Sequence, residues 1–349
     1  MSHVSQLPWL LGKPQISARL KATPEDFEVN EQFEVNLSGH GEHLWIWLEK
    51  RQWATPQAVA AVAKALGVDR RDVSYSGLKD KQAVSRQWLS VWLPGKHATE
   101  GWQQQLPEGM RVLEQGRHER KLKRGSHQGN KFEIWLRQVS DVPALEARLQ
   151  RVAAQGVPNY FGAQRFGIND SNLADAPQLL AGARLPRWRE GLILSAVRSA
   201  LFNLMVAARI QQHPWPSLLP GDRAQLAGSR SFFAIDQVDD ALLARLASAD
   251  LAPTAAVWGR GPPESDGWPL LTEQAIAAAH PEWCQLLERA GLEQERRVVS
   301  LRPAGLVWQW FGDDLNISFC LPRGCFATAV IRELAATDSE TPDDEDPAE

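Results

Sequence analysis

Strand-like alternation occurs near both ends of this 349-residue chain, and a different pattern separates the two regions. Apolar residues alternate over Glu25–Val35 and again over Leu315–Leu321, and this period of two predicts half-buried strands. Residues 156–300 instead contain helical patterns, such as Leu192–Gln212, and loops marked by Pro and Gly. We therefore expect one sheet domain that is interrupted by an insertion.

Charged residues are distributed unevenly, although the formal net charge is only −4. Residues 51–200 hold 23 Lys and Arg against 13 Asp and Glu, whereas residues 201–300 hold 8 against 12. A basic region favours a polyanionic partner, although a solvated face of uneven charge has the same composition. Residues 338–349 contain seven acidic residues and no Lys or Arg, so we expect a disordered acidic tail there.

Several classes of protein are disfavoured by composition and motifs. Apolar residues make up 44% of the chain and charged residues 23%, as in globular proteins. Apolar runs such as Ala58–Ala63 are far shorter than a membrane span, and Met1–Gly12 does not resemble a secretion signal. The three cysteines form no CxxC pair, which favours a cytoplasmic protein with reduced thiols. Zinc spacings, phosphate loops and nucleophile elbows are missing from the sequence, which favours chemistry by positioned side chains alone.

The segment Gly77–Ala83 is the strongest candidate for chemistry. One strand is predicted to end at Gly77 and another to begin near Ser85, with Asp80 between Lys79 and Lys81. Neighbouring cations favour the ionised form of a carboxylate, which can then act as a nucleophile or general base. The alternative is a polar connection whose charges only form salt bridges.

Two further segments could contact a nucleic acid. Arg117–Arg124 contains the basic side chains of Arg120, Lys121, Lys123 and Arg124, which suit RNA phosphates, although an exposed basic loop would have the same composition. Pro158–Gly167 is dense in aromatic and amide side chains, which can read unpaired bases or pack a tight turn.

With these segments in place, the sequence closely resembles the TruD-type tRNA pseudouridine synthases over nearly its whole length. The resemblance depends on five segments in the family's order: Pro24–Phe27, Gly77–Ala83, Gly129–Phe132, Asn159–Gly167 and Phe326–Thr328. It implies an α+β fold whose pseudouridine synthase catalytic domain has a mixed or antiparallel sheet and is interrupted by an inserted α/β TRUD domain. The implied boundaries are 1–155 and 301–337 for the catalytic domain, 156–300 for the insertion and 338–349 for the acidic tail.

The resemblance also implies a function and a site. The family converts uridine to pseudouridine in tRNA, at position 13 in bacteria, without metal or cofactor. Asp80 matches the catalytic aspartate, and Lys21 matches the basic residue that pairs with it. The substrate pocket is implied at Phe27, Asn130 and Phe326, and Phe132 matches the position of a stacking Tyr in most other synthase families. We expect a cytoplasmic monomer that binds tRNA and no membrane.

The chemistry leaves open what Asp80 does. It could attack the sugar carbon, attack the ring as a Michael nucleophile, or remove the ribose C2′ proton; aromatic rings would hold the detached uracil in each case. Two rival functions are a non-catalytic RNA-binding module and a nucleoside-cleaving enzyme. The latter would need a second carboxylate, for which Glu25 and Asp26 are the candidates.

Overall fold

The computed structural model describes residues 3–95, 98–229 and 231–338, which form two compact units. The sheet unit comprises Ser17–Val142, Ala304–Gly324 and the chain from Thr337. The helical unit comprises Met1–Ile16, Pro143–Pro303 and Cys325–Ala336. Apart from Asp338, the tail predicted over residues 338–349 lies outside the described residues.

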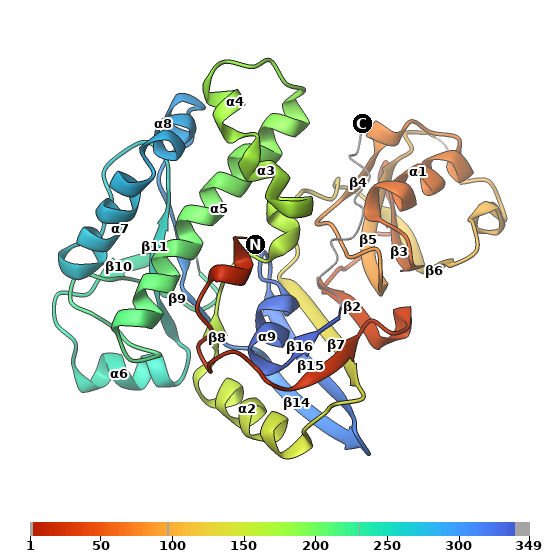
Figure 1. The fold of residues 1–349 in the computed structure, drawn as a ribbon. Coiled ribbons are helices and arrows are strands. Elements are labelled where there is room, and N and C mark those ends of the chain that lie inside the picture. The colour runs from red at the N-terminus through yellow and green to blue at the C-terminus, as the bar shows by residue number, and fades with distance from the viewer. Residues whose placement is uncertain (1–2, 96–97, 230, 339–349) are drawn as a thin grey trace. The chain divides into compact units, whose positions relative to one another are not determined.

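The sheet unit is built on a mixed sheet (Figure 1). In the described residues its main path runs, strand by strand, through β14 (Ala304–Phe311), β15 (Asp314–Pro322), β7 (Gly129–Arg137), β2 (Phe27–Gln32), β5 (Val84–Trp92), β3 (His43–Arg51) and β6 (Met110–His118). The neighbours β2 and β5 are parallel, and the other neighbours on this path are antiparallel. This mixed sheet with separate helices confirms the expected α+β class.

Short elements complete the sheet unit. The strand β1 (Ser17–Leu20) pairs with β7, and β4 (Val73–Tyr75) pairs with β5. The strand β16 (Ala336–Thr337) spans the sequence boundary between the units. Three 3₁₀ turns are η2 (Pro24–Asp26), η3 (Arg70–Asp72) and η4 (Trp102–Gln105).

The predicted strand at Glu25–Val35 is shorter in the structure than the alternation suggests. Pro24 begins the turn η2, which a reciprocal capping box between Thr23 and Asp26 closes. The strand β2 therefore starts only at Phe27.

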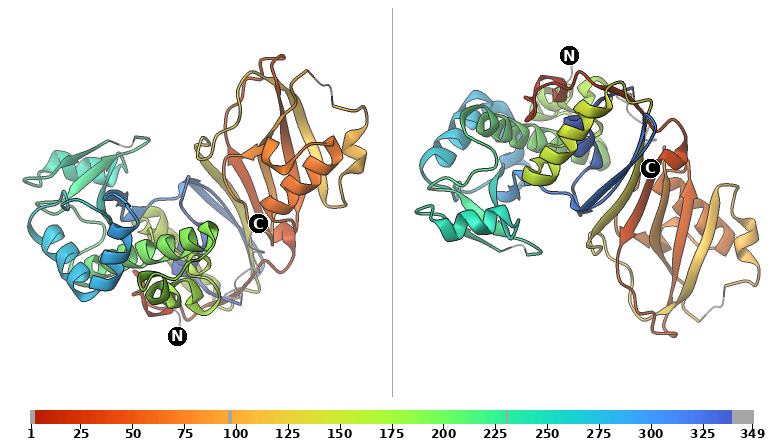
Figure 2. Two further views of the ribbon diagram at one scale, coloured as in Figure 1. Left: turned by 90° about the horizontal axis from the view of Figure 1, so that it is seen from above. Right: turned by 90° about the horizontal axis from the view of Figure 1, so that it is seen from below.

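The helix α1 (Thr55–Leu66) covers one face of the sheet (Figures 1 and 2). Its apolar stripe packs against buried residues of β3 and β5, including Ile46 and Leu89. Pro56 near the start and Gly67 after the end predict a helix over Thr55–Leu66 from the sequence, with Thr55 as its N-cap. The bounds are confirmed, but the N-cap is not Thr55. Ala54 takes that position, and the Thr55 hydroxyl donates to the side-chain oxygen of Gln87.

The helical unit is organised around α5 (Arg187–Gln212), which packs against four further helices and a strand. Its other helices are α2 (Val142–Gln155), α3 (Ser171–Ala174), α4 (Ala176–Leu180), α6 (Asp240–Ala247), α7 (Gly267–Ala279), α8 (Pro281–Arg289) and α9 (Ala327–Leu334). One sheet has the order β10 (Phe232–Ala234), β9 (Arg223–Leu226), β11 (Leu251–Val257) and β12 (Glu295–Val298), and β8 (Val157–Pro158) pairs with β13 (Ser300–Leu301). The 3₁₀ turns are η1 (Val4–Gln6), η5 (Ala163–Phe166) and η6 (Ile168–Asp170).

The helix α5 is long and apolar enough to cross a membrane by length and composition, although the sequence contains only short uninterrupted apolar runs such as Ala58–Ala63. It begins directly after Pro186, five residues before the predicted helix at Leu192–Gln212. The first turn is polar, so the apolar pattern does not mark it. In the structure, 61% of its most apolar window is buried inside the protein, as in the core helix of a globular protein.

The aromatic segment predicted to read bases or pack a turn lies in the core of the helical unit. Tyr160 and Phe166 are buried there, and Phe161 exchanges two backbone hydrogen bonds with the Asn203 side chain. This burial supports the packed turn. The compact helical unit also includes residues 1–16 and 325–336, which the sequence analysis assigned to the catalytic domain.

Candidate active site

Three chain segments that are distant in sequence meet at one end of the mixed sheet, where β2 and β5 begin. This strand end is called the edge below. The strands β2 and β5 are parallel, with Glu28 opposite Val84, so the first residues of both lie at the same edge. The end of β3 reaches this edge as well, because Lys50 is opposite Ser85. The loop that carries Asp80 enters β5 there, beside Phe27 at the start of β2.

Asp80 forms an ion pair with Lys21 at this edge. The Lys21 ammonium lies 3.8 Å from Asp80 Oδ1, and the two side chains are 10% and 29% exposed. Lys21 has a φ of 57°, in the left-handed region, at the break between β1 and β2. Its ammonium also lies 4.5 Å from the centre of the Phe27 ring. A partly exposed carboxylate therefore faces a nearly buried cation that is itself supported by an aromatic ring.

Buried polar groups hold the backbone of the Asp80 loop in place. The ammonium of the fully buried Lys50 donates to the backbone carbonyls of Trp53 and Asp80, the latter at 3.0 Å. The backbone N–H of Lys79 donates to the Thr55 hydroxyl at 3.0 Å. Neither Lys50 nor Thr55 was singled out in this role from the sequence. Both side chains are buried, and a buried polar group must find a hydrogen-bond partner, which is the signal that could have pointed to them.

Lys79 is not the ion-pair partner of Asp80. Its ammonium lies 2.8 Å from Glu31 Oε1, and both side chains are essentially buried. The other Glu31 oxygen accepts from the backbone N–H of Trp88 at 3.0 Å. The expected role of Lys79 beside the Asp80 carboxylate is therefore corrected: Lys79 ties its loop to β2 and β5, and Lys21 supplies the cation.

Aromatic rings from three strands lie together on one face of the sheet. Phe132 of β7 is opposite Phe319 of β15, and the ring centres are 5.5 Å apart. The Phe27 ring lies 6.1 Å from Phe132 in an edge-to-face arrangement. All three rings are buried, so they form a rigid apolar floor. Phe319 was missed as a site residue, although its alternation with Ile317 and Leu321 predicted its strand.

Asn130 lies on the same face as Glu31 and Leu321, its register partners in β2 and β15. Its side-chain oxygen is buried and has no hydrogen-bond partner among the described residues. Gly129, before it, allows a close strand approach, because a Cβ there would lie 2.2 Å from the Leu321 carbonyl oxygen. The Asn130 amide is thus a free acceptor beside the aromatic floor.

Phe326 lies in the helical unit, where it occupies the N-cap position of α9 and is half-buried. Its ring lies 6.2 Å from Phe161. That Phe326 helps to form the substrate pocket together with Asp80 stays a prediction.

The basic segment after β6 is an exposed irregular strap over the second face of the sheet. The side chains of Arg120, Lys121, Lys123 and Arg124 are exposed, while Leu122 is buried beside Trp45 and Trp88. The backbone N–H of Leu122 donates to the Ser90 hydroxyl at 2.9 Å, and the Trp45 indole donates to the Arg120 carbonyl at 2.8 Å. We call residues 120–124 the basic strap.

The basic strap ends beside the Asp80 loop. The backbone N–H of Gly125 donates to the Ser76 carbonyl at 2.8 Å. The Ser76 hydroxyl is hydrogen-bonded to His127 Nδ1 at 2.6 Å. Burial, together with the Lys79 charge, lowers the pKa of His127, which favours the neutral ring. Gly77 makes room for this ring, because a Cβ there would lie 2.9 Å from its Cε1.

The carboxylates proposed for a nucleoside-cleaving mechanism are engaged elsewhere. Asp26 is buried and accepts from two guanidinium nitrogens of Arg137, at 2.9 and 2.7 Å. Glu25 forms an exposed ion pair with Arg51, and the hydrogen bond from that guanidinium lowers the pKa of Glu25. Both carboxylates are therefore paired with arginine side chains.

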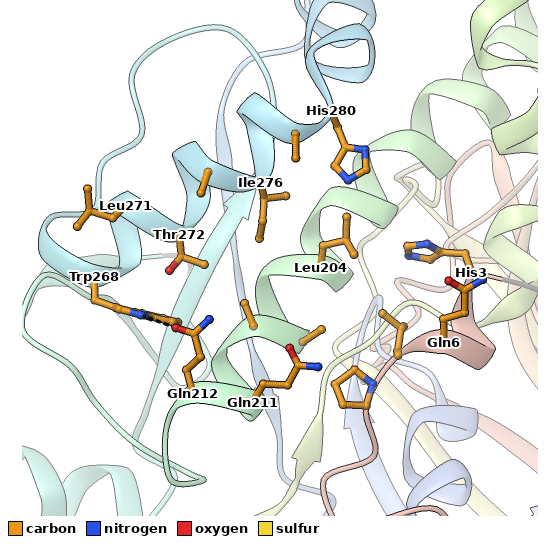
Figure 3. Close-up of a pocket in the computed structure, with 16 residues that line it drawn as sticks. His3, Gln6, Leu204, Gln211, Gln212, Trp268, Leu271, Thr272, Ile276 and His280 are labelled. Carbon is orange, nitrogen blue, oxygen red and sulfur yellow. Dashed lines mark hydrogen bonds between the residues drawn. The ribbon is translucent and has the colours of Figure 1, made fainter.

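The helical unit contains an open groove of about 620 Å³ (Figure 3). The N-terminal segment, α5 and α7 line it with neutral side chains such as Gln211, Trp268 and His280. None of the described residues that line it is Asp or Glu, so this groove lacks a carboxylate. Within the described ranges, no group of three or more His, Cys, Asp or Glu is placed to hold a metal ion.

Comparisons with known proteins agree on one family. Residues 4–174 and 171–334 match the family model described as tRNA pseudouridine synthase D (TruD). A tRNA pseudouridine synthase D from Pseudomonas entomophila is 47% identical over 322 residues, covering 91% of each chain. One from Stutzerimonas stutzeri is 43% identical and covers 95% of this chain and 96% of its own. A crystal structure from Methanosarcina mazei, described as TruD, has a TM-score of 0.68 at 19% identity over 93% of this chain and 95% of its own, which is a likeness of fold.

Proposed function

Since the chain belongs to the tRNA pseudouridine synthase D (TruD) family, we propose that it isomerises uridine, at position 13 of tRNA, with Asp80 as the catalytic carboxylate. The chain is thus a tRNA-modifying isomerase. The observation that carries the residue assignment is the partly exposed Asp80 carboxylate paired with Lys21 at the edge of the aromatic floor.

The reaction moves one bond and requires the base to turn. The bond between N1 and C1′ breaks, C5 bonds to C1′, the C5 proton leaves, and N1 gains a proton. The uridine must leave its stack, because the sugar carbon and ring faces are otherwise covered. Asp80 attacks C1′, attacks the ring or removes the C2′ proton, and each route begins with an ionised carboxylate beside the Lys21 ammonium.

The neighbouring side chains have separate roles in this proposal. Phe27 and Phe132, with Phe326, hold the detached uracil by apolar and stacking contacts that allow rotation in the ring plane. Asn130 accepts a hydrogen bond from an N–H on the uracil edge with its free side-chain oxygen. Retention of the base near the sugar keeps the recombination effectively intramolecular.

The RNA backbone is bound by the basic strap, whose residues Arg120, Lys121, Lys123 and Arg124 are exposed beside the Asp80 loop. The Arg124 guanidinium also lies against the Tyr75 ring. We further propose a cytoplasmic monomer that needs no cofactor. Residues 1–155 and 301–337 would form the catalytic domain, and residues 156–300 the inserted TRUD domain.

The proposal is tested with Asp80→Asn. We expect tritium release from [5-³H]uridine tRNA to fall by about 1,000-fold or more, while tRNA affinity and thermal stability stay close to wild type. Lys64→Gln, on the exposed side of α1, is the matched control and keeps full activity. Near-normal turnover by the Asp80 variant would refute its catalytic role.

Two further readouts separate the rival functions and locate the target. A non-catalytic RNA-binding module would give no pseudouridine with the wild-type chain, and a nucleoside-cleaving enzyme would release free uracil. Carbodiimide mapping of total tRNA from cells that lack this protein, with the wild-type or the Asp80→Asn copy restored, identifies the modified position.

A further inference from the structure

A second pocket lies in the sheet unit, at the opposite end of β5 from Asp80. Its volume is about 350 Å³, and the residues that line it are His43, Arg71, Asp72, Trp92 and Lys121. His43, the first residue of β3, is opposite Trp92, the last residue of β5. Since β4 pairs with β5 with Val73 opposite Val91, the preceding Asp72 and Arg71 reach the same strand end from the other side.

The side chains of this pocket match the parts of a nucleotide. The Trp92 side chain is among the exposed large apolar side chains, at 44%, and its indole N–H donates to Glu42 at 3.2 Å. An exposed indole that is oriented by a hydrogen bond is a stacking surface for a base. Arg71 and Lys121 are exposed cations of the pocket, and such cations suit a phosphate. Arg71 also forms an exposed ion pair with Asp69, which a phosphate would replace.

Two polar groups of the pocket can meet the edge of a base. The Nδ1 atom of His43 is buried and has no hydrogen-bond partner among the described residues. Burial and the Lys121 charge lower the pKa of His43, so the ring is neutral and can donate at one nitrogen and accept at the other. Asp72 lines the pocket as an acceptor, which suits the N–H groups of a base.

The pocket continues the basic strap, because Lys121 belongs to both. The strap passes from Lys121 to Gly125, which is hydrogen-bonded to Ser76 ahead of the Asp80 loop. Along β5, the nine residues from Val84 to Trp92 rise about 3.3 Å each, so the pocket lies roughly 26 Å from the edge at Asp80. A single RNA molecule can therefore contact both places, while the pocket takes no part in the chemistry.

We propose that this pocket holds one unpaired nucleotide of the RNA substrate, with its base stacked on Trp92 and its phosphate between Arg71 and Lys121. The inference rests on the proposed function, because it takes RNA as the substrate. It adds an anchoring contact that increases affinity and selects RNA with an unpaired residue at this distance from the target uridine.

The test compares Trp92→Ala, Trp92→Phe and Arg71→Gln in the full chain with unmodified tRNA transcript. We expect Trp92→Ala to weaken the Kd about tenfold without a change in the salt slope, and Trp92→Phe to restore most of the affinity. Arg71→Gln should weaken binding and reduce the slope of log K against log salt by about 1. The single-turnover rate constant at saturating enzyme should stay within about twofold for all three.

Two controls make the outcome decisive. Phe311→Ala removes another exposed aromatic ring of the sheet unit, and Lys64→Gln removes an exposed cation; both should bind like wild type. An unchanged Kd for Trp92→Ala, or a loss that Trp92→Phe does not restore, would overturn the stacking contact. If the wild type forms pseudouridine, such a result refutes only this pocket; absence of product from the wild type refutes the proposed function.

Discussion

The Asp80 carboxylate is partly exposed, while several polar groups that hold its loop are paired with other partners. Lys50 binds the loop's carbonyls, Thr55 binds a loop N–H, and Lys79 is neutralised by Glu31. Lys21 faces the Asp80 carboxylate, with its ammonium 3.8 Å from Oδ1. At the residue scale, the site is one reactive group inside a set of supporting contacts, and each contact can be removed separately.

The Lys21–Asp80 pair predicts a specific defect in turnover. We expect Lys21→Met to lower the single-turnover rate constant by roughly 10- to 100-fold, because a charge-assisted contact to Asp80 is lost. Lys21→Arg should keep the greater part of the activity, since the positive charge remains. Rapid-quench assays at saturating enzyme measure the rate constant, and fluorescence anisotropy should show a nearly unchanged Kd. A wild-type rate for Lys21→Met would contradict the assigned role.

The buried Lys79–Glu31 pair predicts a defect in stability. Lys79→Met leaves a buried carboxylate unpaired, so the free energy of unfolding should fall by roughly 3–5 kcal/mol. The double variant Glu31→Gln with Lys79→Met should recover at least half of the loss, because the amide oxygen can still accept from the Trp88 N–H. Equilibrium urea unfolding measures both. If the double variant is no more stable than Lys79→Met, the pair is not the source of the effect.

At the scale of elements, the basic strap combines a buried anchor with exposed charges. Leu122 is held against Trp45 and Trp88, so the flanking basic side chains stay outside without any regular secondary structure. This arrangement explains why a segment without strand or helix periodicity keeps a defined path. The parallel pairing of β2 with β5 has a comparable effect at the site, since it places two sequence-distant strand starts at one edge.

The strap makes a prediction about salt. Replacement of Arg120, Lys121, Lys123 and Arg124 together by Ala should weaken tRNA binding and reduce the slope of log K against log salt by about 3, because up to four phosphate contacts are lost. Leu122 is retained, so the strap keeps its anchor. Filter binding between 50 and 200 mM salt would measure the slope, and Lys64→Ala serves as a control. An unchanged slope would place the phosphate contacts elsewhere in the molecule.

At the scale of the whole molecule, the compact helical unit draws on both ends of the chain. Leu7 is buried in its core, and its carbonyl accepts from Arg332 at 2.6 Å. The Gly12 carbonyl accepts from Arg148 at 2.9 Å. The compact helical unit is therefore larger than the predicted insertion at residues 156–300.

Limited proteolysis tests this organisation. We expect residues 156–300 to resist cleavage while the N-terminal segment stays bound to them, and we expect Leu7→Ala to make this fragment cleave faster. A buried Leu replaced by Ala costs about 2–5 kcal/mol, which opens the unit more often. Mass spectrometry of the fragments provides the measurement, and Val307→Ala, at an exposed position of β14, is the control. Equal cleavage rates in both variants would show that Leu7 does not support the fragment.

The sequence alone determined the elements with strong periodicity and supplied the candidate for the catalytic residue. The bounds of α1 and the strand at Leu315–Leu321 follow from local apolar spacing, and the motif around Asp80 makes this residue the proposed catalytic carboxylate. Tertiary structure decided that Lys79, the neighbour of Asp80 in sequence, pairs with Glu31, whereas Lys21, the partner implied by the resemblance, forms the ion pair with Asp80. It also decided that the Phe319 ring packs against Phe132 and that Trp92 lines a second pocket. Such choices depend on register between distant strands, which local pattern does not encode.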